Sequence, residues 1–193
     1  VRDTFLDLIH DKKNAEATEL LVDWIKKNNF IYTTKDDEKT EMWIYKEGIY
    51  VPQGKSEIKE LMRGLLGKWY STSSYNQVIA KIEPDTFIDA EKFFNQRFIE
   101  EIPVKNGILN IYTRELKPFS PEKVFFNKIL AAYDSKAKCE KIDKFLTDVL
   151  SKEDDKFVFY EIVGFSLLKE YKYEEAFMLV GDGRNGKDKS LEL

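Results

Sequence analysis

The sequence has little of what disulfide-rich, zinc-binding and membrane-spanning proteins require. It holds one cysteine, Cys139, which cannot form a disulfide within the chain, and one histidine, His10, which cannot complete a zinc site with a single cysteine. Nothing supports a Ser–His–Asp arrangement around that histidine. No apolar run approaches the roughly 20 residues of a membrane span. We therefore expect a soluble, cytoplasmic protein without a membrane partner, a metal site or catalytic residues.

A surplus of either charge is also missing, as are repeats and Pro- or Gly-rich linkers. Lys and Arg number 31 against 35 Asp and Glu, which gives a net charge of -4. This balance argues against a protein that coats nucleic acid, because neutralising phosphates needs excess Lys and Arg, but it leaves room for a local basic patch. A hydrophobic share of 42% predicts a folded chain with a real core. We expect His10 at the surface and Cys139, three residues before Ile142 on an apolar helix face, in the interior.

The apolar spacing predicts an α+β, predominantly helical fold: a multi-helix accessory domain with two small β-hairpins. In the clearest helix, Ile58, Met62 and Leu65 share one face at three- and four-residue spacing. A polar break is expected over 33–40, and hairpins over 42–51 and about 104–116. The remaining helices are expected over about 15–28, 54–69, 74–84 with Pro84 as the stop, 89–98 with Asp89 as the cap, 142–150 and 151–171.

Three serines are expected to begin helices. Ser74 with Gln77, and Ser151 with Asp154, have the spacing of capping boxes, in which each side chain accepts from an unpaired backbone N–H of the first turn. Ser135 is expected to cap the helix over 142–150.

A phosphate-binding loop motif lies near the end of the sequence. The apolar run over 176–180 is expected to be a strand, and G-x-x-x-x-G-K follows it directly. In such a loop the glycines let backbone N–H groups turn toward a phosphate, and the lysine reaches the outer phosphates. The alternative is a glycine-rich tail on which nothing packs. The candidate nucleotide-binding residues are Gly181, Asp182, Gly183, Arg184, Asn185, Gly186, Lys187 and Asp188.

The sequence after this motif departs from what ATP chemistry needs. Asp188 stands where a Ser or Thr hydroxyl should bind Mg²⁺, and Ser190 comes two positions too late to replace it. We therefore expect two parts, an accessory domain over 1–175 and the truncated start of a P-loop ATPase over 176–193. No ATPase activity and no bound ATP or Mg²⁺ are expected from this chain.

Several segments together resemble the domain that precedes the helicase in phage and plasmid primases of the poxvirus primase–helicase type. The order and spacing of the matching segments cover roughly residues 40 to 187. They are Trp43-Ile44-Tyr45, Gly48-Ile49-Tyr50, Val104 to Asn110, Glu115 to Pro118, Ser120-Pro121, Ala132-Tyr133-Asp134, Glu161 to Gly164, Tyr171 and Phe177 to Lys187. The resemblance implies that the full protein is a DNA-replication, superfamily-three, AAA+-type helicase. Such a helicase forms a ring and uses ATP and Mg²⁺ to move along single-stranded or forked DNA, often with a primase domain ahead of it.

DNA contact by the domain itself is a further hypothesis from its basic clusters. Residues four apart on one helix form a single stripe, and a tyrosine beside basic residues can stack on a base. The alternative is that these clusters are ordinary solvated faces. The clusters are Lys55, Lys59 and Arg63; Lys105, Arg114 and Lys117 with Tyr112; and Lys136, Lys138, Lys141 and Lys144.

Two other functions remain open from the sequence. The chain could be a stand-alone DNA-binding or regulatory module from a decayed replication gene, or an oligomerisation domain without a DNA role. DNA and a homo-oligomeric ring are thus the expected partners.

Overall fold

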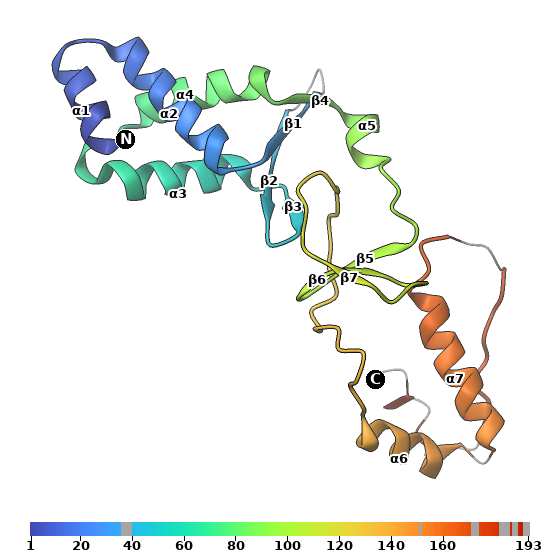
Figure 1. The fold of residues 1–193 in the computed structure, drawn as a ribbon. Helices are drawn as coiled ribbons and strands as arrows, with labels where there is room; N and C mark the ends of the chain where they lie inside the picture. The colour runs from blue at the N-terminus through green and yellow to red at the C-terminus, as the bar shows by residue number, and fades with distance from the viewer. Residues whose placement is uncertain (36–39, 151, 171–173, 182–185, 187–188, 191–193) are drawn as a thin grey trace. The chain divides into compact units, whose positions relative to one another are not determined.

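The structure, a computed structural model, describes residues 1–35, 40–150, 152–170, 174–181, 186 and 189–190 (Figure 1). They divide into unit 1, Val1–Arg97 with Pro118–Ile129, and unit 2, Phe98–Lys117 with Leu130–Leu193. The α+β prediction is confirmed. The elements of unit 1 are α1 (Arg2–His10), α2 (Asn14–Asn28), β1 (Ile31–Lys35), β2 (Glu41–Lys46), β3 (Ile49–Val51), α3 (Gly54–Leu66), the 3-10 turn η1 (Gly67–Trp69), α4 (Thr72–Asp85), β4 (Phe87–Asp89) and α5 (Ala90–Phe94). Those of unit 2 are β5 (Glu101–Val104), β6 (Gly107–Asn110), β7 (Leu116–Lys117), α6 (Glu140–Val149) and α7 (Glu153–Ser166).

Unit 1 is built on a four-stranded sheet of order β3-β2-β1-β4. The predicted hairpin is confirmed as β2 and β3, and its turn at Glu47 and Gly48 has positive φ at both residues, as a two-residue type I′ turn requires. The expected polar break over 33–40 is wrong in its first part, because Ile31–Lys35 forms β1 between two neighbours. It pairs antiparallel with β2 and parallel with β4.

The core of unit 1 lies among α2, α3, α4 and the sheet. Apolar side chains at helical spacing, including Leu21, Ile25, Ile58, Met62 and Ile82, are fully buried there. Burying each such side chain contributes about 1.5–3 kcal/mol. The amphipathic spacing seen in the sequence therefore does define the interior of this unit.

An aromatic cluster covers another part of the unit 1 sheet. Tyr50 and Phe93 are at its centre, with ring centroids 5.7 Å apart. The Tyr50 hydroxyl donates to the carbonyl of Pro121 at 2.7 Å, and the Tyr50 amide donates to the carbonyl of Phe125. Burial raises the pKa of the Tyr50 phenol above its usual range. These bonds fix residues 118–129 to β3.

Two expected boundaries of α4 are wrong. Ser71, not Ser74, is the N-cap, and its hydroxyl accepts from the Ser74 amide at 3.1 Å. The helix also continues through Pro84 to Asp85, because a proline in the last turn removes only one backbone bond. Thr86 then ends the helix by donating its hydroxyl to the carbonyl of Ile82 at 2.8 Å. The Asp89 cap of α5 is confirmed, although α5 ends at Phe94.

Unit 2 contains a three-stranded antiparallel sheet, β5-β6-β7, and the helices α6 and α7. The predicted second hairpin is confirmed and gains a third strand. Lys169, beyond α7, donates its Nζ to the carbonyls of Phe98 at 3.2 Å and Glu101 at 2.5 Å. Desolvation lowers the pKa of this ammonium. The sheet and the end of α7 are thereby joined within the unit.

Three expectations about the helices of unit 2 are corrected. Cys139, not Ser135, is the N-cap of α6, and Cys139 is exposed because an N-cap residue lies outside the apolar face of its helix. α7 begins at Glu153 with no side-chain cap and ends at Ser166. The expected cap Ser151 lies outside the described residues.

Candidate nucleic-acid interface

The turn between β6 and β7 is held by the side chain of Asn110. Its Oδ1 accepts from the amides of Tyr112 at 3.0 Å and Thr113 at 2.8 Å, and its carbonyl accepts from the Arg114 amide at 2.8 Å. Arg114 has a φ of 60°, a left-handed conformation that closes the turn. The side chain of Tyr112 is 61% exposed at this turn. An Asn that satisfies two backbone donors makes the turn rigid while its aromatic tip stays open to solvent.

A second asparagine holds the segment that follows Leu130 against the other turn of the sheet. The Nδ2 of Asn106 donates to the carbonyl of Tyr133, and the Tyr133 amide donates to the Oδ1 of Asn106, both at 2.9 Å. The Lys105 amide also donates to the carbonyl of Ala131 at 3.0 Å. These three bonds fix residues 131–133 beside the β5–β6 turn.

We call Lys105, Tyr112, Arg114 and Lys117 the hairpin surface. All four are exposed and come from the turns and last strand of the unit 2 sheet. Lys117 lies 3.4 Å from Glu115, an exposed pair that contributes little to stability. Within the described ranges, no ion pair engages Lys105 or Arg114. Their positive charges are therefore available to a ligand.

The α3 stripe of Lys55, Lys59 and Arg63 is exposed on unit 1, but two of its members already have partners. Lys55 forms a 2.6 Å ion pair with Glu83, and the Arg63 guanidinium donates to the carbonyl of Gly67 at the helix end. The structure brings the three residues onto one face, as predicted. Each cluster thus has one cation in an ion pair, and on α3 the Arg63 guanidinium is in addition bonded to the backbone.

The third basic cluster is split between a loop and a helix. Lys136 and Lys138 precede α6, whereas Lys141 and Lys144 lie on it, and all four are exposed. The Lys136 amide donates to the Asp134 carboxylate at 2.9 Å. The turn residues Asn106, Asn110 and Asp134 were not singled out from the sequence as site residues, although Asn and Asp in short polar segments are the signal for such turns.

The phosphate-loop motif is described only at Gly181 and Gly186. Asp182, Gly183, Arg184, Asn185, Lys187 and Asp188 lie outside the described residues. Gly186 has a φ of 85°, and the carbonyl of Gly186 accepts from the amide of Ser190 at 3.0 Å and from its hydroxyl at 3.1 Å. This i to i+4 amide bond is that of one α-helical turn. The expected strand over 176–180 is not present, because residues 174–181 pair with no strand in the described part of the chain.

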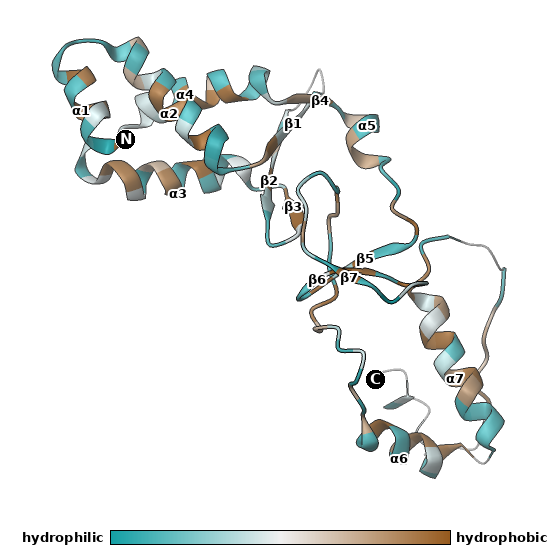
Figure 2. Ribbon diagram, viewed as in Figure 1, coloured by the Kyte–Doolittle hydropathy of each residue, from teal (hydrophilic) through white to brown (hydrophobic). Residues whose placement is uncertain are grey.

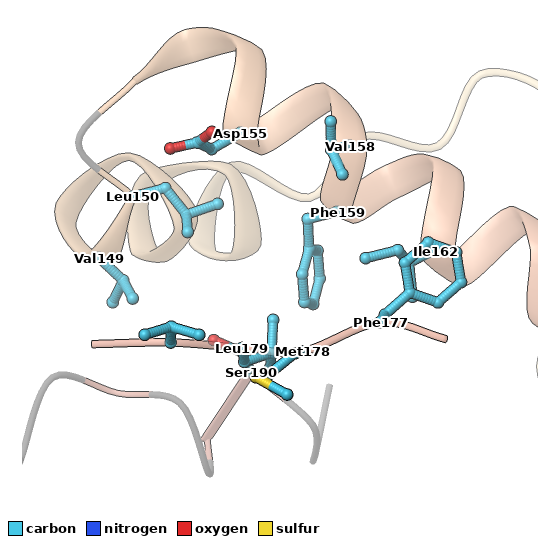
Figure 3. Close-up of a pocket in the computed structure, with 11 residues that line it drawn as sticks. Val149, Leu150, Asp155, Val158, Phe159, Ile162, Phe177, Met178, Leu179 and Ser190 are labelled. Carbon is cyan, nitrogen blue, oxygen red and sulfur yellow. The ribbon is translucent and has the colours of Figure 1, made fainter. Parts of the chain in front are cut away.

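The segment before Gly181 lies against the two helices of unit 2. Residues of this segment and of both helices line a pocket of about 370 Å³. Figure 3 shows Phe159 of α7 pointing toward Met178 and Leu179, with Val149 of α6 at one end of the pocket and Ile162 of α7 beside Phe177 at the other. The rings of Phe165 and Phe177 meet edge to face, 5.9 Å apart. Most of the residues that line this pocket are apolar.

The described part of the chain shows neither a membrane-crossing helix nor a group of metal ligands. No helix there combines the length and apolar character that a crossing requires. Nor do three His, Cys, Asp or Glu side chains come together there as a metal ion would need.

The fold defines a helix-rich α+β domain with two small sheets. The family model described as D5 N terminal like matches residues 4–151, which include all of unit 1 except its first three residues, the unit 2 sheet and α6. The chain therefore belongs to this family, the N-terminal domain of D5-like primase–helicase proteins. The comparison with curated proteins gave no match. The family predicted from the sequence is confirmed at this level.

Proposed function

We propose that the chain is an accessory domain of a plasmid- or virus-type DNA-replication helicase of the poxvirus primase–helicase type, and that it contacts DNA through the hairpin surface. The family assignment supports a replication role. The observation that carries the DNA contact is the rigid β6–β7 turn, which exposes Tyr112 beside the unpaired charge of Arg114. Basic side chains would bind phosphates without regard to sequence, and Tyr112 would stack on a base.

We further propose that residues 1–175 form the accessory domain and that 176–193 begin a P-loop ATPase. The positive φ of Gly186 and the hydrogen bond from the Ser190 amide to the Gly186 carbonyl fit a loop that leads into a helix. When bound, ATP with Mg²⁺ would drive movement along DNA. Asp188 in place of a Ser or Thr does not fit the Mg²⁺ ligand, so this chain alone is proposed to bind neither group.

Oligomerisation is a second candidate function, favoured by the apolar surface of α7. Phe157 is 60% exposed and Val163 47% exposed, and Figure 2 shows hydrophobic residues recurring along this helix. A helix that is apolar on several sides normally packs against more than one neighbour. Light scattering of the whole chain tests this role: a stable oligomer supports it, and a monomer at high concentration contradicts it.

DNA binding is tested by fluorescence anisotropy with labelled single-stranded and duplex DNA over a range of salt. The variant Lys105→Ala/Arg114→Ala/Lys117→Ala is compared with Lys55→Ala/Lys59→Ala/Arg63→Ala, which removes the same charge from α3. The salt dependence is the slope of the logarithm of the binding constant against the logarithm of the salt concentration. We expect the hairpin variant to reduce the size of this slope by about 2, because each lost phosphate contact removes roughly 0.7–0.9. The α3 variant should bind like the original chain. Absence of binding at low salt, or loss only in the α3 variant, would contradict the proposal.

A further inference from the structure

A groove of about 300 Å³ lies beside the β6–β7 turn, within unit 2. Its apolar lining comes from Leu109 and Ile111 of the hairpin and from Leu167 just beyond α7. Its polar lining includes Arg114 of the β6–β7 turn and Asp134 of the segment after Leu130. The groove thus combines an apolar surface, a cation and a carboxylate in the volume of a small ligand site.

Both walls of the groove are held by hydrogen bonds that need no ligand. Asn110 fixes the turn that carries Arg114, and the two bonds between Asn106 and Tyr133 fix the opposite segment. The Asp134 carboxylate accepts from the Lys136 amide, so its position is set as well. A preformed site loses little conformational entropy when a ligand binds.

The two charges of the groove do not cancel each other. In the described part of the chain, Arg114 and Asp134 form no ion pair, although both line the same groove. A ligand that carries both an anion and a hydrogen-bond donor would satisfy both. A nucleotide has this arrangement, with a phosphate at one end and ring or exocyclic N–H groups on its base.

We propose that this groove binds one unpaired nucleotide of single-stranded DNA, an inference that rests on the proposed DNA contact. Arg114 binds the phosphate, and the base lies on Leu109, Ile111 and Leu167. Asp134 accepts from an N–H on the Watson–Crick edge of the base. Every base has such a donor, and in a duplex the partner strand occupies it, so the carboxylate favours unpaired bases of any sequence.

The test compares the affinity of the whole chain for a short oligothymidylate, for an abasic strand of equal length and charge, and for duplex DNA. We expect the thymine strand to bind about tenfold more tightly than the abasic strand, because only the thymine base buries apolar surface in the groove and donates to the Asp134 carboxylate. Asp134→Asn keeps an acceptor for the Lys136 amide and removes the charge. This variant should lower the ratio of the affinity for the thymine strand to the affinity for the abasic strand. It should not weaken binding of the abasic strand, because loss of a negative charge cannot reduce attraction to phosphate.

Arg114→Gln should weaken binding of both strands, whereas the charge-matched control Lys27→Gln on α2 should change neither affinity. Circular dichroism verifies that each variant is folded. Equal binding of the two strands, with binding still dependent on Arg114, would overturn the nucleotide groove and the stacking of Tyr112, and would leave the phosphate contact of the hairpin surface standing. Failure of every strand to bind, or binding indifferent to Arg114, would overturn the DNA contact itself and the groove with it. An RNA strand that binds more tightly than DNA would reassign the ligand and overturn the proposal as stated.

Discussion

Two glycines of the same helix should respond in opposite ways to the same substitution. Gly54 begins α3 where the helix meets β2, and a Cβ added there would lie 2.8 Å from the carbonyl oxygen and 3.0 Å from the carbonyl carbon of Met42. A backbone group of a paired strand cannot move away easily. Gly64, in the last turns of the same helix, has open space around the corresponding position.

We expect Gly54→Ala to lower the free energy of unfolding by about 2 kcal/mol, within the range for overpacking a core. For a chain of this size that corresponds to roughly 4–8 °C in Tm. Gly64→Ala should instead raise it by up to about 1 kcal/mol, because alanine is the better helix former and meets no neighbour. Urea and thermal unfolding followed by circular dichroism measure both. A neutral or stabilising Gly54→Ala would refute the close packing of α3 on β2.

Three further substitutions test other contacts. Tyr50→Phe should cost about 1 kcal/mol by leaving the Pro121 carbonyl without its donor, measured by urea unfolding, with an unchanged midpoint as the contrary result. Burial raises the pKa of Tyr50 in the folded state, so the protonated phenol stabilises the fold fully below pH 10, and this stabilisation falls as pH rises further. Tyr50→Phe should reduce that loss of stability at alkaline pH. An identical pH profile in the variant would contradict the burial of Tyr50. Ser71→Ala should cost about 1 kcal/mol of stability in thermal unfolding by removing the α4 cap, and no change would refute that cap. Asn106→Ala should speed amide hydrogen exchange in residues 131–133, because the two hydrogen bonds between Asn106 and Tyr133 are lost. Unchanged exchange would show that these bonds do not hold the segment.

Helices α2, α3 and α4 of unit 1 were predictable because their apolar residues repeat at helical spacing, whereas α1 over Arg2–His10 was missed. Ile58 and Met62 are fully buried as that spacing requires, and the hairpin turn at Glu47 and Gly48 follows from local turn chemistry. β1 and β4 were missed for the opposite reason. Both are short, and their pairing, such as Thr33 opposite Phe87, joins segments far apart in the sequence. Local pattern carries no information on such a partner.

Site residues divide in the same way. The exposed cations Lys105, Arg114 and Lys117 could be named from composition and turn signals alone. Tyr133 and Asp134 could not be named as site residues from the sequence. Their place beside the hairpin depends on hydrogen bonds between Tyr133 and Asn106, which lies 27 residues earlier in the chain. Cys139 was expected to be buried, but it is exposed. The helix starts one or two residues away from its expected position, and this difference moves Cys139 off the apolar face.

The position of DNA on the hairpin surface can be mapped by photocrosslinking. Single-stranded DNA containing photoreactive thymine analogues is crosslinked to the whole chain at low salt, and the adducts are located by peptide mass spectrometry. We predict adducts concentrated between Gly107 and Lys117, with Tyr112 the main site, and their loss in Tyr112→Ala. Adducts confined to α3, or spread evenly over exposed lysines, would contradict the account.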